Sequence, residues 1–205
     1  MSNNAVEKSN AFLKAVKERR TYYGLSKGTV ISNERIQEIV NEAVKHTPSA
    51  FNSQSARVVV LFGDQSDKLW SITKETLRKI VPAGSFAPTE ERINGFSNGS
   101  GTVLFFEDQT VVEGLQAQFA AYADNFPIWS NQSSGMLQLV IWTALEQEGL
   151  GASLQHYNPL INDEVAQTWN IPSEWKLIAQ MPFGKPTFVP GDKEFQPLED
   201  RVRFI

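Results

Sequence analysis

Apolar residues recur along the chain at two spacings, one typical of helices and the other of strands. After Ser32, apolar positions from Ile36 to Val44 fall at i, i+3, i+4, i+7 and i+8, which predicts an amphipathic helix with Ser32 as its N-cap. The segment from Arg57 to Phe62 is mainly apolar and β-branched, and it predicts a buried strand. The same criteria predict further helices over 4–20, 66–81, 112–122, 136–145 and 163–169, and further strands over 102–106, 152–157 and 176–181. Together these segments predict a mixed α/β architecture.

The pattern also predicts which parts of these elements are buried. The residues expected to form the buried stripe of the first helix are Val6, Phe12, Leu13 and Val16. The helix expected over 136–145 is apolar on nearly every side, so it should be central and buried. Residues 83–101 are rich in loop-forming residues, with a short helix expected from Pro88, and should form either a lid or a surface excursion.

The C-terminal residues 185–205 differ from the rest of the chain. They contain Pro186, Pro190 and Pro197 and show no helical period, so they should form an extended arm. Arms of this kind often pack against a second subunit. No repeat or flexible linker divides the chain, so we expect a single domain over 1–205 that ends in this arm.

Composition restricts the chemistry and the partners. With 205 residues, 41% of them hydrophobic, the chain can bury one substantial core. It contains no cysteine, which excludes thiol nucleophiles, disulfides and iron–sulfur clusters, so a cofactor would have to carry any electrons. A net charge of −4 and a pI near 5.3 argue against nucleic acid and anionic membranes as partners. The N-terminal segment lacks the apolar stretch of a signal peptide, and we expect a cytoplasmic protein.

Several familiar catalytic sites are excluded by their missing motifs. The two histidines, His46 and His156, are not accompanied by G-x-S-x-G, which argues against nucleophilic hydrolysis. Neither H-E-x-x-H nor a cysteine cluster offers a metal site, and there is no P-loop or G-x-G-x-x-G turn. We therefore expect no metal centre.

Four polar segments remain as candidate binding sites, and each has a structural alternative. Arg19-Arg20-Thr21 offers two guanidinium groups and a hydroxyl to a phosphate, or forms a basic helix end. Pro48–Gln54 offers hydroxyl and amide groups to a heterocycle or polyol, or forms a polar loop. The glycines of 148–151, followed by Gln155-His156-Tyr157, allow a ligand to approach the backbone, or form a helix C-cap beside a core histidine. Arg201-x-Arg203, taken alone, indicates a solvated tail.

In their order and separations, these segments resemble the nitroreductase superfamily of FMN-dependent oxidoreductases over nearly the whole chain. The resemblance is carried by Arg-Arg-Thr at 19–21, Pro-Ser and Asn-Ser-Gln within 48–54, Gly-Leu-Gly at 149–151 and Phe-Gly-Lys-Pro at 183–186. Each motif is weak alone, but their collinearity is strong. The variants Arg-Arg-Thr-Tyr-Tyr and Leu-Gln-His-Tyr-Asn-Pro are most similar to the short subgroup of fatty-acid-repression-mutant proteins and bacterial stress-induced nitroreductases.

The resemblance implies a mixed sheet flanked by helices, in a homodimer that exchanges the C-terminal arm and holds two FMN molecules at its interface. The residues it implies for the FMN phosphate are Arg19, Arg20, Thr21, Arg201 and Arg203. Those implied for the ribityl chain and the ring edge, commonly from the partner subunit, are Ser49, Asn52 and Gln54. The isoalloxazine would lie against the backbone of Leu154, Gln155 and His156, where an amide donor near N5 stabilises the reduced flavin.

Two positions depart from the family's pattern. Tyr23 stands where the family often carries a Lys or Arg that faces the flavin pyrimidine, so the balancing charge must come from elsewhere, with Lys185 as one candidate. His156 stands where many members carry an acidic residue, which bears on nicotinamide docking or substrate choice.

The resemblance implies hydride transfer from NAD(P)H to flavin N5 and onward to a nitroaromatic or quinone in a ping-pong sequence. No catalytic residue is assigned, because the flavin carries the chemistry. The alternative is a flavin-binding regulatory or redox-sensor dimer with only incidental reductase activity. The sequence does not distinguish NADH from NADPH, since it has no Rossmann turn with a ribose-reading acidic residue.

Overall fold

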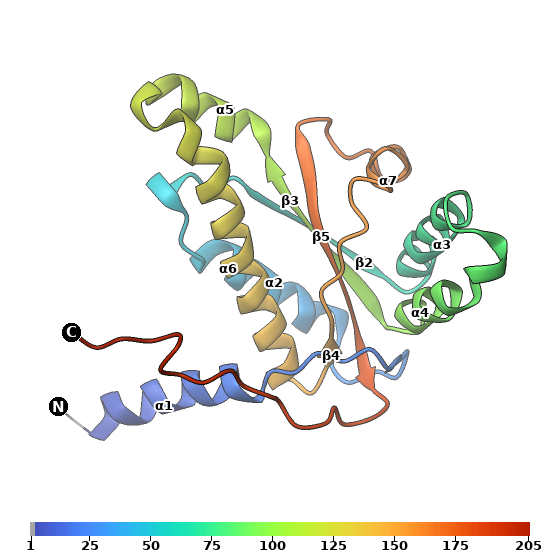
Figure 1. Cartoon of the computed structure of the whole chain (residues 1–205), viewed down its shortest axis with the longest axis horizontal. Coiled ribbons are helices and arrows are strands. Elements are labelled where there is room, and N and C mark those ends of the chain that lie inside the picture. The colour runs from blue at the N-terminus through green and yellow to red at the C-terminus, as the bar shows by residue number, and fades with distance from the viewer. Residues whose placement is uncertain (1–2) are drawn as a thin grey trace.

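A computed structural model describes residues 3–205 and shows one open sheet (Figure 1). Its strands are β1 (Leu25–Ser26), β2 (Ala56–Phe62), β3 (Gly101–Asp108), β4 (Gly151–Ala152) and β5 (Trp175–Pro186). Within the described residues the order is β1-β5-β3-β2, with β4 also paired to β5, and every pairing is antiparallel. The α/β class is therefore confirmed, whereas the sheet is antiparallel where a mixed sheet was expected.

Helices cover both faces of this sheet. The α-helices are α1 (Asn3–Glu18), α2 (Asn33–His46), α3 (Asp64–Arg78), α4 (Ala87–Ser97), α5 (Gln109–Gln118), α6 (Phe126–Gln147) and α7 (Asn162–Trp169). Helices α2 and α6 lie on one face, and α3, α4 and α7 lie on the other (Figure 1). The fold thus has two apolar layers, one on each side of the sheet.

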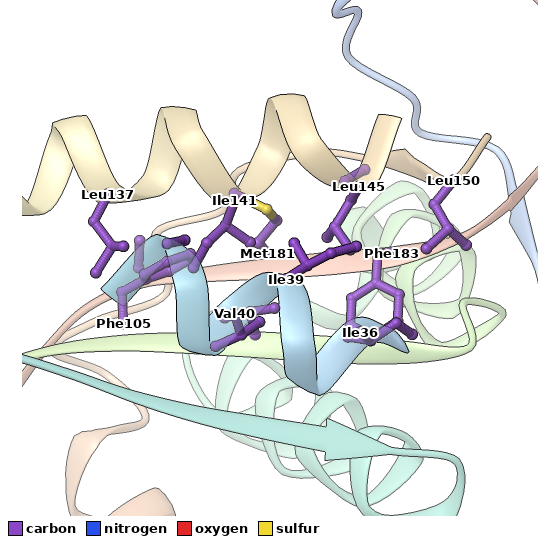
Figure 2. Close-up of a cluster of buried hydrophobic side chains, with 14 residues drawn as sticks. Ile36, Ile39, Val40, Phe105, Leu137, Ile141, Leu145, Leu150, Met181 and Phe183 are labelled. Carbon is purple, nitrogen blue, oxygen red and sulfur yellow. The ribbon is translucent and has the colours of Figure 1, made fainter. Parts of the chain in front are cut away.

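The central strand β3 supplies side chains to both layers. Val103 and Phe105 pack under α2 and α6, whereas Leu104 and Phe106 pack under α3, α4 and α7. This division follows from the period of a strand, in which successive side chains point to opposite faces. Figure 2 shows the first layer, in which α2 (Ile36, Ile39, Val40) and α6 (Leu137, Ile141, Leu145) meet Phe105, Met181 and Phe183 of the sheet.

The helix predicted after Ser32 is present with its expected cap, whereas the strand predicted over 57–62 is less buried than expected. In α2, Ser32 accepts a hydrogen bond from the Arg35 N–H at 3.2 Å, so the predicted cap is confirmed. The strand predicted over 57–62 is present as β2, but it lies at the edge of the sheet and only Leu61 is fully buried. An edge strand has a neighbour on one side only, which explains the partial burial.

The apolar stripe predicted to be buried in α1 is largely exposed in the single chain, so this prediction is wrong. Phe12 is 66% exposed and Leu13 is 57% exposed, whereas Val16 is half-buried. Val6 lies outside the residues whose side chains are described. Helix α1 projects from the body of the molecule and meets it near the C-terminal end of α6, so one chain alone cannot cover its apolar stripe (Figure 1).

The predicted burial of α6 is correct on one side of the helix. Leu137, Ile141 and Leu145 are buried against the sheet. The apolar residues on the other side, Met136, Leu139 and Val140, are exposed. Exposed apolar faces of this kind are typical of surfaces that contact another molecule.

Three other predicted segments differ from the structure in the bounds or type of their elements. The segment 83–101 is more helical than expected, because a 3-10 turn (Ala83–Ser85) is followed by α4. The strand expected over 152–157 is reduced to β4 and one bridge between Gln155 and Gln180. The helix expected over 112–122 ends at Gln118 and continues as the 3-10 segment Ala120–Asn125.

The chain after β5 carries no helix or strand and runs back beside α1 (Figure 1). Its start is held by the Thr187 N–H, which donates to the Gly24 carbonyl at 3.1 Å. Further along, the Lys193 ammonium donates to the Lys17 carbonyl at 2.8 Å. Exchange of this arm between subunits stays a prediction. Across the described residues, none of the helices combines the length and apolarity needed to span a membrane.

Candidate functional site

The segment that follows α1 carries a cluster of positive charge around one carboxylate. The Arg20 main-chain N–H donates to both oxygens of Glu146, at 2.6 and 2.7 Å. Burial raises the pKa of Glu146, and this rise is opposed by the Arg20 N–H and by the charges of Arg19, Lys193 and Arg20. The pKa of Lys193 is lowered by desolvation and by the two arginines. Three cations therefore surround a single carboxylate, an arrangement that favours an added anion.

Arg19 presents a guanidinium group to this cluster without a full set of partners. Its guanidinium carbon lies 4.2 Å from the centroid of the Trp142 ring. Among the described residues, both Arg19 Nη1 and Trp142 Nε1 are buried and lack a hydrogen-bond partner. A buried donor without a partner is costly, so these two donors mark a place for an acceptor.

The backbone after this basic cluster is bonded to β4, which precedes the segment 154–156. The Tyr22 N–H donates to the Ala152 carbonyl at 2.9 Å, so the residues after Arg19-Arg20-Thr21 run beside β4. A Cβ on Gly151 would lie 2.8 Å from the Tyr22 side chain, which explains the glycine. The residues that follow 19–21 therefore lie beside β4, which leads along the chain into the segment 154–156.

The segment 154–156 uses only part of its backbone for the sheet. The Gln155 N–H donates to the Gln180 carbonyl at 2.7 Å, and the Gln180 N–H returns a bond to Gln155 at 2.9 Å. Because amide groups alternate in direction along an extended chain, the N–H groups of Leu154 and His156 point away from β5. Leu154 packs against the first apolar layer, and the His156 side chain is exposed.

A cavity of about 610 Å³ opens beside Tyr23. It lies between the segment Tyr23–Gly24, helix α4 and Phe188, and its walls include Arg92, Gly95 and Phe96. The ring centroids of Tyr23 and Phe96 are 6.5 Å apart, and Tyr23 is 57% exposed. The cavity therefore combines aromatic walls with a cation.

The segment Ser49–Gln54 forms a tightly constrained loop. Ser49 Oγ accepts the Gln54 N–H at 3.0 Å. Phe51, Asn52 and Gln54 have φ values of 58°, 50° and 51°, in the left-handed region that side chains other than glycine rarely adopt. Phe51 stacks on Trp129 of α6, with ring centroids 5.9 Å apart. Such strain persists only where the surroundings impose it, and it is common at functional loops.

This loop and the basic cluster lie at opposite ends of α6. The loop packs on Trp129 and the cluster on Trp142, which are separated by roughly 20 Å along a helix that rises about 1.5 Å per residue. A single chain therefore does not bring Ser49, Asn52 and Gln54 to Arg19. Arg201 and Arg203 are exposed, and in the described part of the chain neither side chain bonds to residues 19–21.

A buried acid, Glu107, is hydrogen-bonded to Ser55, the residue that follows the constrained loop. It is 1% exposed, and its Oε2 accepts hydrogen bonds from Ser55 and Ser130, both at 2.6 Å. Burial raises the pKa of Glu107, and the two hydroxyl donors and Arg57 oppose the rise. Its Oε1 is buried and lacks a partner within the described chain. Glu107 thus ties the strand after the loop to the start of α6.

Sequence reasoning missed Arg92, Trp142 and Glu107. Arg92 falls in the short helix expected from Pro88, within a segment interpreted as a lid or surface excursion, and Trp142 falls in a helix interpreted as core. For Glu107 a signal existed, because a carboxylate pair follows directly on an apolar strand. No group of His, Asp or Glu side chains in the described residues is arranged to hold a metal ion.

Comparisons with known proteins identify the family of this chain. Residues 16–185 match the Nitroreductase family. The HBN1 protein of Saccharomyces cerevisiae is 40% identical over 187 residues, which cover 90% of this chain and 92% of HBN1. Nitroreductase CinD from Lactococcus lactis, solved with chloramphenicol, is 46% identical with a TM-score of 0.87, covering 95% of this chain and 99% of CinD.

A more distant solved structure shares the fold. It is a nitroreductase from Desulfitobacterium hafniense with bound FMN, 17% identical with a TM-score of 0.68, and it covers 94% of this chain and 97% of its own. At this identity the likeness concerns the fold alone.

Proposed function

Because this chain belongs to the nitroreductase family, we propose that it is an FMN-dependent oxidoreductase that takes electrons from NAD(P)H and passes them to nitroaromatic or quinone acceptors. The observation that carries the proposal is the buried donor pair of Arg19 and Trp142 in a cluster of cations, joined by backbone to an extended segment and an aromatic cavity. Members of the family generally use FMN. CinD was also solved with 4-nitrophenol, so nitroaromatics are the first acceptors to test.

The residues present fit FMN in the chemistry of their donors. Arg19 Nη1 and Trp142 Nε1 supply donors without partners, and Arg20 and Lys193 add positive charge, as a phosphate requires. Thr21 follows directly and adds a hydroxyl. The neighbouring cavity has the aromatic lining that a flat ring system needs.

In the proposed mechanism the chain binds, orients and shields the reacting groups. When bound, FMN would accept a hydride and release the electrons to the second substrate. Arg19, Arg20 and Thr21 would fix the phosphate, and the free N–H groups of Leu154 and His156 would donate to the ring edge where charge develops. Tyr23, Phe96 and Phe188 would exclude water from one side of the site.

The proposal includes a homodimer, because Ser49, Asn52 and Gln54 reach the same FMN only from a second subunit. Exposed apolar residues on α6 and α1, described above, supply a surface for this contact. The exchanged arm, with Arg201 and Arg203 at the partner's phosphate site, belongs to the same proposal. A cytoplasmic location and a role in stress responses also stay predictions.

Substituting Leu139 by Asp is expected to raise the dissociation constant of the dimer by about tenfold or more, because a carboxylate would be desolvated in an apolar contact. FMN content should fall with it, since each site would lose the partner's loop. Light scattering across a concentration series and the absorbance of bound flavin measure both effects. Ile80→Asp, which places the same charge at an exposed residue after α3, serves as the control. A Leu139→Asp protein with wild-type mass and flavin content would contradict a contact through this face of α6, and a wild type with the mass of one chain would contradict the dimer.

The experiment that tests the function is an anaerobic absorbance spectrum before and after addition of NADH and then NADPH. A yellow protein that bleaches with one nucleotide and recovers with 4-nitrophenol or a quinone is the expected result, and it identifies the donor. Slow turnover with every acceptor, together with a tightly bound protein partner, would favour a regulatory flavoprotein instead. A protein that cannot be reconstituted with FMN would overturn the proposal.

A further inference from the structure

The cavity beside Tyr23 contains a positive charge that no motif indicates. Of the described residues that line it, only Arg92 is a cation, and Glu91 is the one carboxylate. Arg92 projects from α4, a helix that joins the walls of the cavity through Gly95 and Phe96. A cation at an aromatic cavity suits a flat ligand that carries or acquires negative charge.

Arg92 is not engaged in a structural ion pair. Arg35, Arg57 and Arg78 each pair with a carboxylate at 3.0 Å or less. For Arg92, no hydrogen bond or ion pair forms with any described residue. Its guanidinium group is therefore available to a ligand.

The charge of Arg92 also acts on Tyr157, which is connected to the cavity through aromatic contacts. A series of aromatic contacts leads from Tyr23 through Phe96 and Trp70 to Tyr157, with centroid distances of 6.5, 4.9 and 5.9 Å. Burial raises the pKa of Tyr157, and the charge of Arg92 opposes that rise. The field of Arg92 thus reaches the residue that directly follows the segment 154–156.

Lys185, the other cation considered for this role, is directed elsewhere. A Cβ on Gly28 would lie 3.0 Å from Lys185 Cδ, so the Lys185 side chain packs along the Gly28 backbone. It is not part of the cavity wall.

Building on the proposed function, we propose that Arg92 faces the pyrimidine edge of the bound flavin and stabilises its reduced, anionic form. Tyr23 leaves its own position without a charge, and Arg92 reaches the same cavity from α4. A fixed cation beside a group that becomes anionic on reduction favours the reduced state. Arg92 is then a cofactor-contacting residue that sets the flavin's redox preference.

The test measures the affinities of the full-length apoprotein for oxidised and for reduced FMN, and the midpoint potential of the same protein loaded with FMN. In Arg92→Gln we expect the preference for reduced over oxidised FMN to fall about tenfold, which is a shift of about 30 mV to more negative potential for a two-electron couple. Arg92→Lys should retain most of the preference. Glu91→Gln, which removes the carboxylate from the same cavity, should shift the potential in the opposite direction.

Lys68→Gln is the matched control, because Lys68 is exposed on α3 and does not line the cavity. Its potential should equal that of the wild type. An Arg92→Gln protein with the potential of Lys68→Gln would overturn the role of Arg92 and leave the proposed function intact. A wild-type protein that binds no FMN would instead overturn the proposed function, and the role of Arg92 with it.

Discussion

An Arg19→Ala variant is expected to bind FMN about 10- to 150-fold more weakly than the wild-type chain. The guanidinium group lies over Trp142 with one buried nitrogen that lacks a partner in the described structure, so it is already desolvated and positioned for an anion. Removing a charge-assisted hydrogen bond costs about 1.5–3 kcal/mol, which corresponds to this loss of affinity. Fluorescence titration of the apoprotein with FMN measures it.

Two further variants separate phosphate binding from a general charge effect. Lys14→Ala removes a cation from the same segment, but its exposed side chain pairs with Glu18 at 3.6 Å, and its affinity should be unchanged. Trp142→Phe retains the aromatic ring under Arg19 and removes the Nε1 donor, so it should show a smaller loss than Arg19→Ala. Equal affinities for Arg19→Ala and Lys14→Ala would show that the phosphate binds elsewhere.

The fold was predictable from local pattern wherever burial is decided within one chain. Helix α2 shows this, because its cap and its apolar stripe are both satisfied by neighbouring elements. The prediction failed for Phe12 and Leu13, and for the outer face of α6, because those residues are apolar without a covering element in the chain. Periodicity reports that a face avoids water, but it does not report which molecule covers that face.

Some residues of the candidate site were likewise predictable from local motifs, whereas others depend on tertiary structure or on a second subunit. The order of motifs assigned Arg19-Arg20-Thr21 and Leu154-Gln155-His156 to one cofactor, and a backbone hydrogen bond from Tyr22 to Ala152 brings the chain after the first segment beside β4, which precedes the second. Arg92 was missed because a single arginine on a helix carries no motif, and only the tertiary placement of α4 brings it beside Tyr23. The contribution of Ser49, Asn52 and Gln54 depends on a second subunit and stays a prediction.

The largest effect on stability is expected at Glu107. Glu107→Ala should lower the free energy of unfolding by about 2–4 kcal/mol, because Ser55 and Ser130 would lose their common acceptor and a cavity would remain. Glu107→Gln keeps an acceptor oxygen and the side-chain volume, so its loss should be much smaller. Chemical denaturation of both variants measures the difference. An Ala variant as stable as the Gln variant would contradict a structural role for these hydrogen bonds.

The dependence of this stability on pH follows from the direction of the pKa shift. Burial raises the pKa of Glu107, so the folded chain retains this proton at pH values where the unfolded chain has released it. Stability contributed by Glu107 is therefore complete below the ordinary pKa of a glutamate and is lost as the pH rises through the raised value. Relative to Glu107→Gln, which does not titrate, the wild type should lose unfolding free energy across that window and level off above it. The opposite slope would show that the two serine hydroxyls and Arg57 outweigh the cost of burying the charge.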